Sequence, residues 1–89
     1  MAKRRERLEI IKDILQVIKD NRKIKPTRLL YSSNLSPQMF KEYIQELKEK
    51  SFMEEIEEKK KKFIVLTHKG ETFLEEYKQL STFIKNFGL

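Results

Sequence analysis

The 89-residue sequence predicts a mainly α domain of the α+β class, with three helices, a β-hairpin and a long C-terminal helix. Two observations lead to this prediction. Apolar residues between positions 25 and 50 recur at helical spacing on both sides of a turn-forming segment. Residues 52–66 alternate between apolar and polar around a run of lysines, which is typical of a hairpin. A chain of this length builds one modest core.

The first helix is predicted from about Arg5 to Asp20. Its apolar stripe contains Leu8, Ile11, Leu15 and Ile18 and is widened by Ile10, Ile14 and Val17. A stripe this broad suggests burial on two sides, against the core and against a partner. The following Lys23-Ile24-Lys25 segment is compatible with a short strand at the edge of the hairpin.

A second short helix is predicted to begin at Pro26-Thr27, with Leu29 and Leu30 facing the core. Ser32-Ser33-Asn34 has the composition of a turn, and Leu35 is the apolar residue that packs into it. The two helices on either side of this turn are therefore expected to form a helix-turn-helix unit.

The third helix is predicted to open at Ser36-Pro37. The Ser36 side chain caps it, and Pro37 takes the first helical position, where its missing N–H costs nothing. The apolar side consists of Phe40, Ile44 and Leu47, with Tyr43 beside them. The opposite side carries Gln38, Lys41, Glu42, Gln45 and Glu49. A helix held by its apolar side, with hydrogen-bonding side chains pointing away, is what reading the major groove of DNA requires.

The hairpin is predicted to pair a strand that begins at Phe52-Met53 with a strand from Lys62 to Leu66, in which Ile64 and Leu66 are core residues. Glu57 to Lys61 forms the tip. Because the tip contains no Gly, Asn or Asp, we expect a longer, mobile loop there rather than a tight two-residue turn.

Thr67 is predicted to cap the last helix, which continues to about Asn86. Its heptad seam consists of Phe73, Tyr77, Leu80, Ile84 and Phe87, spaced alternately four and three residues apart. A helix of some twenty residues is roughly 30 Å long, more than covering this domain requires. We expect its second half to project and to pair with a second copy through Tyr77, Leu80, Ile84 and Phe87. The alternative is that the stripe folds back onto the first helix of the same chain.

The composition argues against an enzyme and against a membrane protein. There is no cysteine, and His68, the only histidine, has no potential partner for holding a metal ion. Gly70 and Gly88 are the only glycines, so a glycine-rich phosphate loop is ruled out, and no serine lies in a nucleophile-elbow pattern. The longest uninterrupted apolar run is Phe63 to Leu66, and the basic start lacks the features of a targeting peptide. We expect no cofactor, metal or small-molecule ligand, and a cytoplasmic, nucleoid-associated location.

The whole excess of positive charge lies near the N-terminus. Residues 1–28 contain ten Lys and Arg against four Asp and Glu, whereas residues 29–89 contain ten of each. Such a patch attracts phosphate backbones through counterion release, and the free N–H groups at a helix start favour the same ligand. The predicted phosphate contacts are Arg4, Arg5, Arg7, Lys25, Thr27 and Arg28. The alternative is a solvated basic surface.

Two further groups are candidates for DNA contact. The predicted contacts of the third helix are Ser36, Gln38, Lys41, Glu42 and Gln45. Glutamine pairs with adenine and lysine reaches guanine or phosphate, but the glutamates of this helix also fit an ordinary solvated face. The predicted wing contacts are Lys59, Lys60, Lys61 and Lys62. These lysines suit a DNA backbone or minor groove, or simply cross-strand pairing with the preceding glutamates.

The order of these motifs resembles the small archaeal winged helix-turn-helix DNA-binding proteins. The matching segments are Arg4-Arg5-x-Arg7-Leu8-Glu9-Ile10-Ile11, Leu29-Leu30-Tyr31, Leu35-Ser36, Tyr43, Leu66-Thr67-His68-Lys69-Gly70 and Phe73-Leu74-x-x-Tyr77. The resemblance implies a winged helix-turn-helix with a three-helix core and a β-hairpin wing. It also implies a transcription regulator or chromatin protein that binds double-stranded DNA as a homodimer. Some relatives are joined by an antiparallel coiled coil of their last helices.

On this reading residues 1–66 are the DNA-binding domain and residues 67–89 are a dimerisation helix continuous with it. The chain departs from the family pattern at Ser51, where a glycine usually follows the recognition helix, so a left-handed cap there is expected to be strained or absent. The wing tip is a second departure, because it lacks the usual turn residues. The competing reading is a winged-helix scaffold for protein–protein assembly without DNA binding, motivated by the acidic residues of the third helix.

Overall fold

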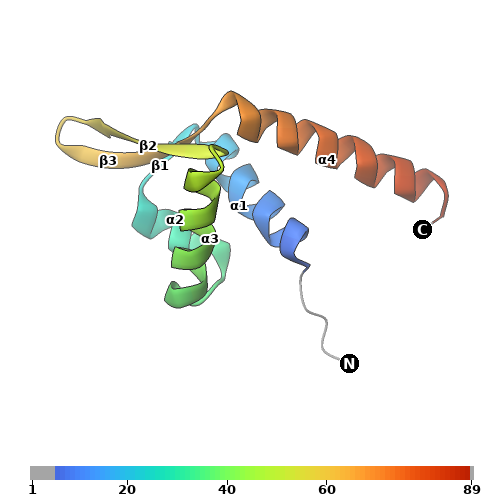
Figure 1. Ribbon diagram of the computed structural model, residues 1–89, viewed down its shortest axis with the longest axis horizontal. Coiled ribbons are helices and arrows are strands. Elements are labelled where there is room, and N and C mark those ends of the chain that lie inside the picture. Colours follow the sequence, from blue (N-terminus) through green and yellow to red (C-terminus); the bar gives the residue numbers. More distant parts are fainter. Residues whose placement is uncertain (1–5, 89) are drawn as a thin grey trace.

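The chain folds into four helices and a small sheet, in a computed structural model that describes residues 6–88. The elements are α1 (Arg7–Asn21), β1 (Lys23–Ile24), α2 (Pro26–Ser33), α3 (Pro37–Glu49), β2 (Met53–Glu58), β3 (Lys61–Leu66) and α4 (His68–Asn86). Helices α1 to α3 bundle at one end of the hairpin, the wing extends to one side, and α4 leaves on the other (Figure 1). The mainly α winged-helix class and the long C-terminal helix are confirmed. Within residues 6–88, no helix has both the length and the apolarity needed to cross a membrane.

The three strands form one antiparallel sheet in the order β1-β3-β2. The short strand β1 joins the free edge of β3, with Lys23 opposite Val65 and Ile24 opposite Ile64. This pairing attaches the wing to the segment between α1 and α2. At the base of the wing, β3 is therefore paired on both of its edges, with β2 and with β1.

The turn at the wing tip corrects our expectation. Strands β2 and β3 stay paired up to Glu58 and Lys61, so Lys59 and Lys60 alone form a two-residue turn. Both have positive φ, 50° and 66°, as the favoured hairpin turns of this length require. The prediction of a longer loop is wrong because pairing along the whole hairpin outweighs the cost of placing two lysines in a left-handed conformation.

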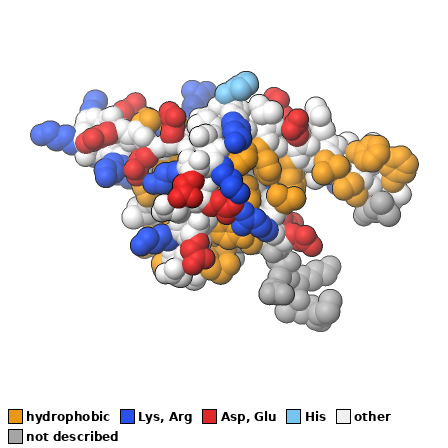
Figure 2. Space-filling model, in the orientation of Figure 1, with side chains coloured by type: hydrophobic (Ala, Val, Ile, Leu, Met, Phe, Trp, Pro, Cys, Tyr) orange, Lys and Arg blue, Asp and Glu red, His pale blue; other side chains and the backbone are white. Residues whose placement is uncertain are grey.

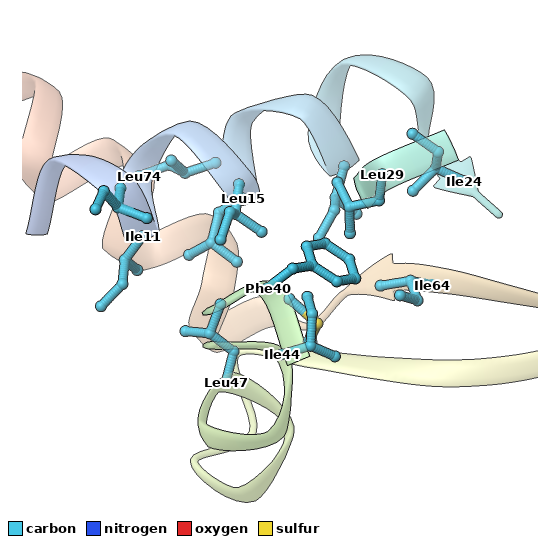
Figure 3. Packing of buried hydrophobic residues seen from close by; sticks show 13 residues of the cluster. Ile11, Leu15, Ile24, Leu29, Phe40, Ile44, Leu47, Ile64 and Leu74 are labelled. Carbon is cyan, nitrogen blue, oxygen red and sulfur yellow. The ribbon is translucent and has the colours of Figure 1, made fainter. Parts of the chain in front are cut away.

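Side chains from every helix and every strand contribute to one core. The most completely buried are Ile14, Leu15, Ile18, Leu29, Leu47, Met53 and Ile64. Figure 3 shows Phe40 and Ile44 of α3 directed into the space between Leu15, Leu29 and Ile64. The apolar side of α3 is thus the side that holds it, as predicted, and its polar side is left to solvent.

The apolar stripe of α1 is used almost entirely within its own chain. Ile10 and Ile14 are buried in the core, so they are not available to a partner, contrary to the two-sided burial we expected. Leu8 differs from the rest of the predicted stripe, because 56% of it is exposed. It lies one residue inside the start of α1.

Both predicted N-terminal caps are present, whereas two expectations about helix C-termini, the turn at Ser32-Ser33-Asn34 and the cap at Ser51, are corrected. The Ser36 hydroxyl accepts from Met39 N at 3.2 Å, and the Thr67 hydroxyl accepts from Gly70 N at 3.1 Å. Helix α2 continues through Ser33, and the turn starts at Asn34, which has φ 59°. Ser51 has φ 64°, so the left-handed residue after α3 is present although it is a serine.

Candidate nucleic-acid interface

The polar side of α3 forms one continuous exposed face. Its predicted DNA contacts, Ser36, Gln38, Lys41, Glu42 and Gln45, are all exposed. Basic and acidic side chains alternate over this part of the molecule in the view of Figure 2. The structure therefore places the five predicted residues together, on a helix that the core keeps rigid from the other side.

The glutamines of this face already have partners within α3. Gln38 Nε2 donates to Glu42 Oε2 at 3.0 Å, and Gln45 Nε2 donates to Glu49 Oε2 at 3.1 Å. Each contact spans one helical turn on the exposed surface, where such bonds exchange readily with water. To contact a base, each amide would exchange its glutamate for the base edge.

Glu46 stands apart from the other acidic residues of α3. Its carboxylate forms ion pairs with Arg7 of α1 and with Lys50, the latter at 2.7 Å. The hydrogen bond from Lys50, and next that from Arg7, lowers the pKa of the Glu46 carboxyl. Two cations thus offset this glutamate, which reduces the repulsion between α3 and a phosphate backbone.

Arg7 is the one described member of the predicted basic arm. Its guanidinium pairs with Glu46 and lies 5.8 Å from the centre of the Tyr43 ring. Arg7 therefore ties the start of α1 to α3, a role that spacing in the sequence did not reveal. Arg4 and Arg5 lie outside the described residues.

The start of α2 presents a second basic surface. Lys25 is its N-cap residue and makes no side-chain capping bond, and Thr27 and Arg28 follow in the exposed first turn. Tyr31 lies one turn further on and is 85% exposed. Sequence reasoning did not single out Tyr31 as a candidate contact, although its spacing of three and four residues from Arg28 and Thr27 places all three on one side of α2.

The four lysines of the wing differ in their surroundings. Lys59 and Lys60 form the tip, whereas Lys61 and Lys62 face Glu58 and Glu57 across the hairpin. The Glu58 carboxylate also pairs with Lys23 of β1, whose ammonium lies 4.9 Å from the centre of the Phe63 ring. Two glutamates of the wing thus have lysine partners outside the hairpin, Glu58 in Lys23 and Glu55 in Lys48, and the two tip lysines lie in the turn beyond the paired strands.

The second half of α4 carries an exposed apolar surface. Phe73 packs edge-on against Phe52 at 5.5 Å, so the first position of the predicted seam belongs to the chain's own core. Beyond Tyr77 the helix projects from the body (Figure 1) and carries exposed apolar side chains at its tip (Figure 2). These are Leu80, Phe83, Ile84 and Phe87. Sequence reasoning missed Phe83, which stands one residue before Ile84 and whose ring lies 4.9 Å from that of Phe87.

A helix-turn-helix within a bundle of three helices, together with a three-stranded sheet that includes a hairpin wing, defines the winged helix-turn-helix class. The model of the winged helix-turn-helix family matches residues 4–85, and the chain belongs to this family. A comparison with curated protein sequences gave no match.

Solved structures of the same fold come from several sources. Sso10a-2, a DNA-binding protein from Sulfolobus solfataricus, superposes with a TM-score of 0.74 at 22% identity, over 93% of this chain and 85% of that one. SSV1 F-93 superposes with a TM-score of 0.69 at 24% identity, over 88% of this chain and 91% of that one. BpsR of Bordetella bronchiseptica, whose DNA binding is regulated by 6-hydroxynicotinic acid, gives 0.72 at 16% identity, over 86% of this chain and 57% of BpsR. The resemblance to small archaeal winged-helix proteins is thereby confirmed at the level of fold.

Proposed function

We propose that this protein binds double-stranded DNA as a homodimer and acts as a transcription regulator or chromatin component. The observation that carries the proposal is α3, whose apolar side is buried and whose polar side is exposed over its whole length. A helix held in this way fits the major groove of B-DNA. Sso10a-2, which has the same fold, is a DNA-binding protein.

Phosphate contacts on either side of α3 would set its position in the groove. Lys25, Thr27 and Arg28 at the start of α2 supply cations, a hydroxyl and free N–H groups, and Tyr31 adds a second hydroxyl on the same side. The tip lysines of the wing suit a neighbouring stretch of backbone. Such contacts fix register and orientation without reading sequence. The net charge of +6 supports the same interaction.

The second half of α4 is the proposed dimerisation surface. Four large apolar residues that the body of the chain does not cover are more than scattered exposure explains. We expect Tyr77, Leu80, Ile84 and Phe87 to pair with the same residues of a second copy, and Phe83 to flank the seam. Residues 1–66 would then contact DNA, and residues 67–89 would join the two copies.

A titration against random-sequence duplex at several salt concentrations tests the proposal. Micromolar or tighter binding that weakens steeply with salt is the expected result, because counterion release dominates contacts of this kind. No binding at low salt would contradict DNA binding. It would favour the scaffold reading, in which the glutamates of α3 face a protein partner.

A further inference from the structure

The end of α3 and the start of α4 meet at a closely packed corner. We define the α3–α4 corner by Lys50, Ser51, Phe52, Thr67, Lys69 and Gly70. Three of its backbone carbonyls are held from the α4 side. Lys69 Nζ donates to Lys50 O at 2.7 Å, the Thr67 hydroxyl donates to Ser51 O at 2.6 Å, and Thr67 N donates to Phe52 O at 3.2 Å.

The bond from Lys69 suits its position electrostatically. Carbonyls at the C-terminal end of a helix lack intrahelical partners and carry partial negative charge, so an ammonium group there is favourable. The same ammonium lies 4.7 Å from the centre of the Phe52 ring. Lys69 therefore contacts both the last turn of α3 and the residue that leads into β2.

Gly70 sets how closely the two segments approach. A Cβ atom at this position would lie 2.2 Å from Phe52 O and 3.0 Å from Leu66 Cδ2. The nearer atom belongs to the backbone, which cannot move aside as a flexible side chain would. Any larger residue must push α4 away from the segment that follows α3.

We propose that Lys69 and Gly70 are positioning residues that fix the orientation of α3 relative to α4. This inference rests on the proposed function, in which α3 enters DNA and α4 joins two copies. The separation of the two α3 helices in such a dimer follows from the orientation at each corner. Half-sites on B-DNA lie about 34–36 Å apart for each helical turn, so a wrong separation prevents both helices from binding together.

The geometry magnifies a small change at the corner. Helix α3 has 13 residues and is therefore about 20 Å long, with the corner at its C-terminal end. A rotation at Lys50 displaces the N-terminal half, including Gln38 and Lys41, further than any other part. These are among the proposed base contacts.

Distance measurement between two spin labels within one chain tests the inference directly. The chain has no cysteine, so a spin label attaches only where a cysteine is introduced. Suitable exposed positions are Lys41→Cys on α3 and Gln79→Cys on α4. Doubly labelled chains diluted with unlabelled protein report the α3–α4 distance without DNA and regardless of dimerisation. The parent protein should give one narrow distribution.

Variants at the corner should change that distribution in two different ways. K69M keeps the aliphatic stem over Phe52 and loses the ammonium, so the distribution should broaden. G70A should shift its mean, because α4 must move away from Phe52 O. K69R should restore the narrow form, since guanidinium also donates to a carbonyl and stacks on an aromatic ring. K78M, the same change further along α4, should leave the distribution unchanged.

The functional consequence is measured on unlabelled chains. The duplex affinity of K69M should fall about tenfold, because joining two binding sites raises the overall affinity and a loosened corner loses part of that gain. Its helix content and dimer mass should stay unchanged. Distributions for K69M and G70A that match the parent would overturn the inference. If G70A does not fold, the exposed K69M substitution decides the matter alone. Absence of DNA binding or of a dimer in the parent would instead remove the proposed function, and the distance measurement would still report on the corner.

Discussion

Arg7, the first residue of α1, forms an ion pair with Glu46 in α3, 39 residues further along the chain. Lys50 donates to the same carboxylate from one turn below. Glu46 is thus a junction between the N-terminal end of α1 and the helix proposed to enter DNA. Its surroundings lower the pKa of its carboxyl group, first through Lys50 and then through Arg7.

The lowered pKa predicts a specific dependence of stability on pH. A carboxyl whose pKa is lower in the folded state stabilises the protein above its ordinary value, here 4.5, and that contribution is lost as the pH falls through the lowered value. E46Q should therefore melt at a lower temperature than the parent at neutral pH, and the difference should vanish in strong acid. Thermal melts across this range measure it, with E75Q as the control for loss of one surface charge. A difference that persists in acid would contradict the ion-pair explanation.

Charge reversal at the start of α2 tests the phosphate contacts. Lys25→Glu combined with Arg28→Glu should weaken binding to duplexes of every sequence, and each lost contact should reduce the slope of affinity against salt by about 1. The control is Lys19→Glu with Lys78→Glu, an equal change of charge in the groove between α1 and α4. Unchanged affinity and slope in the α2 variant would exclude this surface from the interface.

Tyr31 provides a test that separates binding from folding. Because it is 85% exposed, Y31A should leave the melting temperature nearly unchanged. Its affinity for duplex DNA should fall several-fold on all sequences alike, as expected for a lost phosphate contact. The affinity of Y31F should fall as much as that of Y31A if the hydroxyl makes the contact. S32A, which removes a neighbouring exposed hydroxyl, is the matched control, and equal affinity for all four proteins would exclude Tyr31.

The proposed dimer is tested by replacing Leu80 and Ile84 with Glu. Burial of each side chain against a second copy would contribute roughly 1.5–3 kcal/mol before the cost of association, so two buried charges should abolish pairing. Light scattering should then show a folded monomer, and duplex affinity should fall because the two sites no longer bind together. Gln79→Glu with Thr82→Glu, on another side of the same helix, should remain dimeric. A parent mass near that of one 10.8 kDa chain would exclude the dimer.

The wing tip should be stabilised by residues suited to its backbone. Lys59→Asn with Lys60→Gly places the preferred pair in a turn whose two residues have φ 50° and 66°. Asn and Gly adopt the left-handed conformation at a lower cost than lysine, so the free energy of unfolding should rise by about 1 kcal/mol, as measured by denaturant titration. Lys61→Ala with Lys62→Ala removes the same charge without changing the turn. If the salt dependence of duplex affinity falls equally in both variants, the charge of the wing acts in DNA binding. If it falls in neither, the wing is not part of the DNA interface.

Several features of the fold were predictable because their signals are local. Ser36 and Thr67 cap helices by bonding to N–H groups three residues away, so the sequence around each position contains the whole interaction. The apolar side of α3 follows in the same way from the spacing of Phe40, Ile44 and Leu47. With α3 placed, the exposure of Gln38 and Gln45 follows as well, although their bonds to Glu42 and Glu49 do not.

The sequence by itself determined the elements and their order, because periodicity and caps act within a few residues, and the order of the motifs indicated the family by resemblance. Only the tertiary structure decided features that depend on how elements meet. Lys59 and Lys60 form a tight turn because the strands pair along their full length, which no property of lysine predicts. Gly70 lies against Phe52 because two segments converge at the α3–α4 corner. Strand pairing and the packing of Gly70 both depend on segments that meet only in the folded chain, and local sequence patterns do not show how closely those segments will meet.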